Sequence, residues 1–215
     1  MTTGRAETFA DGVLAIAATL LILNVGSNLP AATHATHGLG HSLIQSWPTF
    51  AAYGISFFTI GIIWVNHHAL MNQIARVDRT FLFITVFFLM TVSFIPFPTR
   101  LIADNLLHGE GRVAAITYGF TLTATAVAFN AMWLYAIRDR RLLREDADPA
   151  VVRGITRSYL AGPWVYLLAT AVAIASPGAS LILFAAFNLF WVLESSLFGR
   201  DKEPAAEFSG ETDEA

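Results

Sequence analysis

Six long apolar stretches constrain the fold of this chain more than any other feature of its sequence. Each approaches the length of about 20 residues that a helix needs to cross the hydrocarbon core of a bilayer. They occupy residues 8–25, 47–65, 80–97, 113–137, 159–175 and 181–198. Backbone groups in lipid must bond within the membrane segment, and unbroken apolar runs without two-residue alternation favour helices over a β-barrel. The sequence therefore predicts an all-α integral membrane protein of six transmembrane helices.

Composition narrows the possible functions. Of the 215 residues, 55% are hydrophobic and 13% are charged, against about 25% charged in soluble domains. Cysteine is absent, which excludes disulfides, thiolate metal sites and cysteine nucleophiles. The sequence has no Gly-x-Ser-x-Gly elbow, no His-Glu-x-x-His motif and no Walker-type loop. We therefore expect no enzyme activity and no cofactor and, because the net charge is only −3, no nucleic-acid partner.

The distribution of Lys and Arg predicts the orientation in the membrane. With the N-terminus inside, the predicted cytoplasmic segments hold eleven of these residues, and the outer loops hold only Arg100 and Arg112. Positive residues are retained on the cytoplasmic side, so both termini are expected there. Residues 1–200 then form one six-helix module, and the acidic segment 201–215 is expected to be a disordered cytoplasmic tail.

Two acids fall inside the predicted membrane segments, Asp11 and Glu194. Ionisable groups at such positions are functional hypotheses by default. Asp11, with Glu7 before it, also argues against the alternative that the first 35 residues are a cleaved signal peptide. Glu194 is expected to be structural, reaching the interface or pairing with Arg200.

Asp11 has two possible partners on the second predicted helix. That helix runs from outside to inside, so Trp64 and His67 reach the depth of Asp11 near the cytoplasmic side. A hydrogen bond from Asp11 to either side chain is therefore available. We expect Asp11 to hold helices together rather than to bind the permeating ion.

Helical phasing divides the first predicted helix into two faces. One narrow stripe, bordered by Phe9, consists of Arg5, Gly12, Ile16, Thr19 and Leu23. A second face, roughly a third of a turn away, consists of Asp11, Ala15, Ala18 and Ile22. Small residues on the second face suit packing on a neighbouring helix. From periodicity alone, Ile16 and Leu23 can equally be ordinary lipid-facing or core side chains.

Three histidines precede the second predicted helix at spacings of three and four: His34, His37 and His41. On a helix they would lie on one side and could bind a transition metal. No acid lies near them, and the segment contains Gly and Thr. We therefore favour a solvated outer loop and expect no metal site.

Several motifs resemble those of the transmembrane protein 175 family of potassium channels. The opening Arg5-x-x-x-Phe9-Ala10-Asp11 is similar to that family's Arg-x-x-x-Phe-Ser-Asp signature. Pro96-Phe97-Pro98-Thr99 resembles the motif that closes its third helix. The pattern that ends its second helix is resembled by Phe57, Gly61, Trp64, His67 and His68. The resemblance covers the first half of the chain by specific residues and the second half by helix count.

The resemblance implies a passive potassium channel in a bacterial cell membrane, in which four copies surround a pore lined by the first helix. Position by position, Ile16 matches the narrowest hydrophobic constriction, Thr19 the threonine one turn above it, and Leu23 the next apolar layer. The expected partners are potassium ions, other copies of the chain and lipids.

The family signature implies a second set of roles, in a network that holds the pore helix against its own subunit. It comprises Arg5, Phe9 and Asp11, with Trp64 and His67 as partners. The chain departs from the signature at Ala10, where the family usually has Ser, and at Gly12, where close helix approach or local bending is conceivable. A small secondary transporter is the main alternative function, and a membrane scaffold or intramembrane enzyme is a third.

Overall fold

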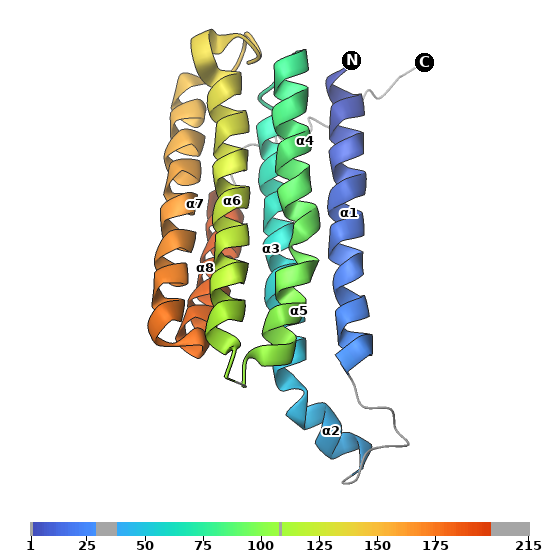
Figure 1. The fold of residues 1–215 in the computed structure, drawn as a ribbon. Helices are drawn as coiled ribbons and strands as arrows, with labels where there is room; N and C mark the ends of the chain where they lie inside the picture. Colours follow the sequence, from blue (N-terminus) through green and yellow to red (C-terminus); the bar gives the residue numbers. More distant parts are fainter. Residues whose placement is uncertain (1, 29–37, 108, 199–215) are drawn as a thin grey trace, which may run out of the picture.

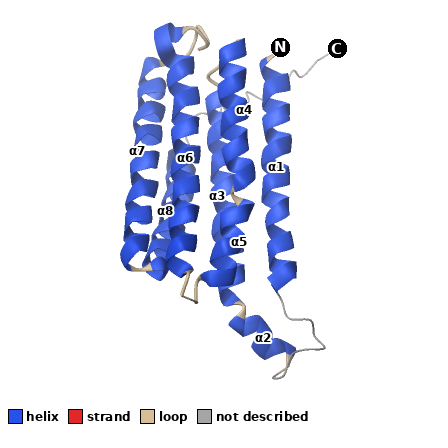
Figure 2. Cartoon of the chain, viewed as in Figure 1, coloured by secondary structure: helices blue, strands red, loops and turns tan. Residues whose placement is uncertain are grey.

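The fold is a bundle of helices whose long members run up and down side by side (Figures 1 and 2). The structure is a computed structural model, and it describes residues 2–28, 38–107 and 109–198. The α-helices are α1 (Thr3–Asn28), α2 (Leu39–Gln45), α3 (Trp47–Met71), α4 (Arg79–Phe94), α5 (Pro96–Asn105), α6 (Gly111–Ile137), α7 (Pro149–Ala175) and α8 (Pro177–Phe198), with a 3-10 turn, η2 (Arg138–Arg140). The predicted all-helical fold is confirmed for these residues.

Five helical segments of the described chain are long and apolar enough to cross a bilayer. They are α1, α3, α4 together with α5, α6 and α7. The sixth predicted stretch corresponds to α8, whose apolar described part, Pro177–Val192, is shorter. Only Ser176 separates α7 from α8, which therefore form a tight helical hairpin.

The third predicted stretch continues well beyond residue 97. A proline has no N–H to donate, and its ring crowds the preceding turn, so a helix breaks or kinks there. Ile95 accordingly separates α4 from α5, which begins at Pro96. The chain then continues as helix to Asn105, and the two pieces form one 27-residue span.

Helix α7 begins ten residues before the predicted start of the fifth stretch, at Pro149 rather than Tyr159. Asp148 caps it by accepting a hydrogen bond from the backbone N–H of Ala150. The first turns carry arginines, which lower the hydropathy without preventing a helix. Pro163 lies inside this helix.

Helix α6 forms the structural centre of the bundle, because it packs against α4, α5, α7 and α8. Trp133 is fully buried, and its indole N–H donates to the Thr156 hydroxyl at 2.9 Å. Phe129 packs edge-on against Tyr159, with ring centroids 4.8 Å apart. Aromatic contacts of this geometry add to the stabilisation from buried area.

The α3–α4 and α6–α7 connections pair with each other at the end of the bundle where α1 begins (Figure 1). Ile74 and Leu143 form an isolated antiparallel bridge. Asp78 caps α4 by accepting from the Phe81 N–H, and it also accepts from the Tyr135 hydroxyl at 2.7 Å. Those hydrogen bonds and the nearby positive charge of Arg141 lower the pKa of Asp78.

The predicted cytoplasmic and outer arginines lie at opposite ends of the bundle. Arg76, Arg79 and the arginines of the α6–α7 connection share the end where α1 begins, whereas Arg100 and Arg112 lie at the other end (Figure 1). His34, His37 and the predicted tail 201–215 lie outside the described residues. The side chain of Glu194 is outside them as well.

Candidate functional site

One face of α1 packs against its own bundle. Its buried residues recur every three or four positions, as one helical stripe does. They are Ala6, Ala10, Leu14, Ala17, Leu21 and Val25. This stripe contacts α3, α4 and α5, and its three alanines allow close approach of the helices.

The opposite face of α1 is the stripe predicted by phasing. Measured around the helix axis at 100° per residue, its residues lie about 140–200° from buried Leu14. Ile16 is 61% exposed and Leu23 is 64% exposed in the single chain. Phe9, which borders the stripe, is 55% exposed. The stripe is therefore free to contact something other than its own subunit.

Thr19 presents a hydroxyl oxygen on this face. The hydroxyl donates its proton to the carbonyl oxygen of Ile16 at 3.0 Å, one turn earlier in the helix. With the proton engaged, the remaining lone pairs of the oxygen can accept a bond or contact a cation. The exposed face thus presents one hydroxyl oxygen, that of Thr19, between the apolar side chains of Ile16 and Leu23.

The second face predicted for α1 is wrong in part. Asp11 and Ala18 are half-buried, but Ala15 is exposed and Ile22 is 51% exposed. Phasing finds which residues share a face, whereas the rotation of that face toward neighbours depends on tertiary contacts. The packing stripe is rotated from the predicted one and contains Ala10 at its centre.

The two departures from the family signature have different surroundings. Ala10 is fully buried in the contact between α1 and its neighbours. Gly12 is exposed, and a Cβ built on it would meet nothing within 4 Å. The close helix approach considered for Gly12 is therefore not made within the described chain.

Two polar pairs join α1 to α3 near the end where α1 begins. The indole N–H of Trp64 donates to Asp11 at 3.0 Å. One turn further toward that end, Nδ1 of His68 lies 2.9 Å from a carboxylate oxygen of Glu7. The pairs are spaced by four residues on both antiparallel helices, so they form successive rungs. The second rung could have been predicted from the first, since Glu7 and His68 follow from that four-residue spacing.

His67 does not bond to Asp11, contrary to one of the two expectations. Its side chain is fully buried and stacks on Phe88 at a centroid distance of 6.0 Å. Neither ring nitrogen has a hydrogen-bond partner within the described chain. His67 and Trp64 lie at similar heights on α3, but Trp64 contacts α1 and His67 contacts Phe88 of α4. Height along the helix does not reveal which neighbouring helix a side chain contacts.

Further contacts hold α1 along its length. The Thr3 hydroxyl donates to the Ala75 carbonyl, and the side-chain amide of Asn24 donates to the Pro96 carbonyl at 2.9 Å. Arg5 is exposed, on the same side of the helix as Phe9. The helix is thus fixed near its start, one to two turns in, and near its end.

No group of three or more potential metal-ligating side chains occurs in residues 2–28, 38–107 and 109–198. His41 lies in α2, where its Nε2 is 2.9 Å from the Gln45 amide nitrogen. The described histidines therefore give no support to metal binding.

Comparison with known proteins identifies the family. The family model described as endosomal/lysosomal potassium channel TMEM175 matches residues 5–96. A potassium channel of Chamaesiphon minutus is 40% identical over 194 residues, which cover 90% of this chain and 95% of that relative. The chain belongs to the TMEM175 family. The predicted resemblance is confirmed, and the family is one of ion channels rather than enzymes.

Two further similarities extend the comparison. The crystal structure of a lysosomal potassium-selective channel TMEM175 homolog from Chamaesiphon minutus superposes with a TM-score of 0.81 at 39% identity, covering 90% of this chain and 97% of that chain. The endosomal/lysosomal proton channel TMEM175 of Gallus gallus is 30% identical over 143 residues, or 64% of this chain and 28% of that protein. The relatives thus bear names that refer to two different cations.

Proposed function

We propose that this chain is a potassium-permeable channel in which four copies surround a pore lined by α1. The observation that carries the proposal is the exposed stripe of α1, directly opposite the stripe buried against α3, α4 and α5. The apolar side chains of this stripe are not covered by their own subunit. A closed cyclic assembly would cover such a face by bringing copies of α1 together around one axis.

Ile16 forms the constriction of this pore, with Thr19 and Leu23 one and two turns further along. A ring of isoleucines impedes ions by excluding water, so ions cross it partly dehydrated. The Thr19 hydroxyl supports this assignment because its proton is held by the Ile16 carbonyl, which leaves lone pairs for a cation. Losing hydration costs the smaller sodium ion more, which favours potassium.

The polar rungs hold the pore helix in place. Asp11 is fixed by Trp64, and Glu7 lies against His68. Arg5 and Phe9 belong to the exposed side and act at the contact between copies or at the pore entrance. His67 acts through packing on Phe88 rather than through a hydrogen bond.

The working topology has six spans with α8 as the last, and both termini in the cytoplasm of a cell membrane. The segregation of arginines to the end where α1 begins supports this orientation. Labelling a cysteine introduced at Gly178 with a membrane-impermeant reagent tests it, because the native chain has no cysteine. Labelling of intact cells is expected, and protection until lysis would contradict the orientation.

The function is tested by ion flux in liposomes that contain the purified protein. Potassium flux is expected with no gradient of a second solute, and replacing potassium by sodium should reduce it. Dependence on a second solute would instead indicate the alternative, a small secondary transporter. Proton flux is measured in the same vesicles, because the name of the Gallus gallus relative refers to protons. Mass measurement in mild detergent should give four subunits, and a conducting monomer would exclude this pore.

A further inference from the structure

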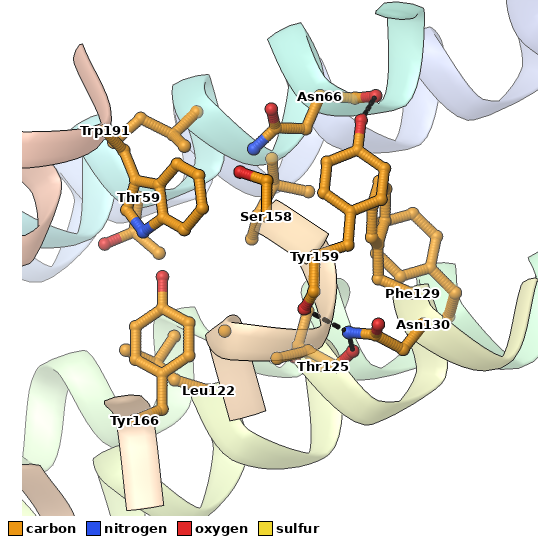
Figure 3. A pocket seen from close by; sticks show the side chains of 15 residues that line it. Thr59, Asn66, Leu122, Thr125, Phe129, Asn130, Ser158, Tyr159, Tyr166 and Trp191 are labelled. Atoms are coloured by element: carbon orange, nitrogen blue, oxygen red, sulfur yellow. Dashed lines mark hydrogen bonds between the residues drawn. The ribbon is translucent and has the colours of Figure 1, made fainter. Parts of the chain in front are cut away.

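We propose that a cavity lined by α3, α4, α6, α7 and α8 is a binding site for a small neutral molecule that carries a hydroxyl group. The cavity has a volume of about 60 Å³ (Figure 3). None of its described lining residues belongs to α1, so the site is separate from the proposed pore.

The cavity lies at the mid-height of the bundle. Thr59 and Gly162 line it, and each is the central residue of its helix, α3 or α7. Thr125 lines it one residue past the centre of α6. From there the cavity extends toward the end of the bundle where α1 begins, where Asn66 and Asn130 line it.

The lining combines polar groups with a hydrocarbon wall and includes no charged side chain among its described residues. Figure 3 shows polar side chains from several helices around the same space, among them Thr59, Asn66, Asn130, Ser158, Tyr166 and Trp191. Ile62, Ile63, Leu122 and Phe129 supply apolar surface. Burying an unpaired ion in such a site is unfavourable, so the lining selects a neutral ligand with both polar and apolar parts.

The side chain of Asn130 is the strongest evidence that the cavity binds a ligand. Its side chain is 7% exposed, and its amide nitrogen donates to the carbonyls of Ala126 at 2.9 Å and Tyr159 at 2.8 Å. Its carbonyl oxygen has no hydrogen-bond donor within the described chain. A buried acceptor without a partner is costly. The missing donor is what a hydroxyl group provides.

The volume limits the size of the occupant. In this measure of accessible volume a single water molecule needs about 10–15 Å³, and an apolar cavity of about 150 Å³ holds benzene. The 60 Å³ cavity therefore suits a short alcohol and is too small for an enclosed aromatic ring. A short alcohol also covers the hydrocarbon wall, which water alone does not.

Photolabelling with 3-azibutanol, a short alcohol with a photoreactive diazirine, tests the site on the purified full-length protein. Adducts located by mass spectrometry should map to lining residues such as Ser158 and Tyr166, and excess 1-butanol should compete with them. Labelling that does not saturate, or that falls only on outward residues such as Trp164, would overturn the proposal, and so would an absence of adducts in the cavity.

A pair of glycine substitutions on α7 provides matched variants. In Gly162→Ala the new Cβ lies 3.9 Å from the Ala126 Cβ, so it fits while narrowing the cavity. In Gly154→Ala the new Cβ meets nothing within 4 Å, and Gly154 does not line the cavity. Labelling should fall about fivefold in the first variant, or ~1 kcal/mol at 1.4 kcal/mol per tenfold, and remain unchanged in the second. Equal labelling of the two variants would contradict the site.

Asn130→Leu removes the acceptor itself. Labelling should fall by a similar factor, because the hydroxyl of the probe loses its partner. If this variant does not fold, the Gly162→Ala result alone decides. Potassium flux is independent of this readout, so failure of the binding site leaves the proposed channel function standing, and the reverse holds as well.

Discussion

Helices α1 and α6 are similar in length, with 26 and 27 residues, yet they are packed differently in the bundle. Helix α6 packs against four other helices, and its buried residues include Tyr118, Phe129 and Trp133 beside several small side chains. Helix α1 buries one stripe of alanines and aliphatic residues and leaves the opposite face exposed. The difference teaches that α6 specifies the subunit fold, whereas α1 also presents a surface that its own chain leaves uncovered.

The largest expected effect comes from truncating the core of α6. Trp133→Ala removes a fully buried indole and its hydrogen bond to Thr156. Such truncations cost about 3–5 kcal/mol, a large part of the roughly 5–15 kcal/mol that stabilises a typical fold. Thermal unfolding in detergent measures the loss, and Leu134→Ala, at an exposed neighbouring position, is the control. Comparable stability of the two variants would break the contrast between the helices.

The exposed face of α1 should respond in conduction rather than in stability. Ile16→Asn replaces the proposed apolar constriction with a polar one, so potassium conductance should rise several-fold and preference over sodium should fall. The cost in subunit stability should stay within about 0.5 kcal/mol, as for other surface positions. Single-channel recordings in potassium and then sodium measure the first effect.

Ile22→Asn is the matched control for that experiment. Ile22 is also exposed but lies on the neighbouring face. Its variant should fold and keep the native reversal potential. An Ile16→Asn tetramer with native conductance and selectivity would remove Ile16, and with it Thr19 and Leu23, from the permeation path.

A smaller effect is expected where α1 is joined to α3. Asp11→Asn and Trp64→Phe each weaken the same hydrogen bond, worth about 1 kcal/mol. The double variant should therefore be hardly less stable than either single variant in a double-mutant cycle. Ion selectivity should remain native. Additive losses, or altered selectivity at unchanged stability, would show that Asp11 acts elsewhere.

The smallest expected effect is a pH dependence of stability that arises from Asp78, the residue that caps α4. The pKa of Asp78 is lowered in the fold, chiefly by the hydrogen bond from the Phe81 N–H. Its contribution to stability is therefore present above the unfolded pKa of about 3.9 and is lost as the pH falls through the lower folded value. Thermal unfolding of Asp78→Asn should show less pH dependence than the native protein below about pH 4. Identical profiles would exclude this coupling.

Much of the fold could be predicted from hydropathy, because long apolar runs must be helical in lipid. The boundaries at Asn105 and Pro149 could not be predicted, since the sequence is polar at both. The helix continues past the kink at Ile95 as far as Asn105, and the cap formed by Asp148 sets the start at Pro149. The pairing of Ile74 with Leu143 joins distant loops. No local sequence pattern predicts such a pairing.

The candidate site shows the same division. Phasing identified the residues of the exposed stripe, because periodicity depends only on sequence spacing. It did not reveal that Ile22 is exposed, since a face has no direction until the neighbouring helices are placed. His67 shows the limit of depth arguments, because its ring stacks on Phe88 instead of reaching Asp11.

The polar anchors of α1 have a mechanical consequence. Ala75 uses both of its backbone groups: its carbonyl accepts from Thr3, and its N–H donates to the Leu142 carbonyl at 2.9 Å. At the far end of α1, Asn24 is tied to Pro96. A piston-like slide of α1 by even one residue, about 1.5 Å, would strain the bonds at both ends together. Tilting of the subunit as a unit keeps all of them, so in the proposed assembly a tilt costs less than a slide as a way to change the width between facing copies of α1.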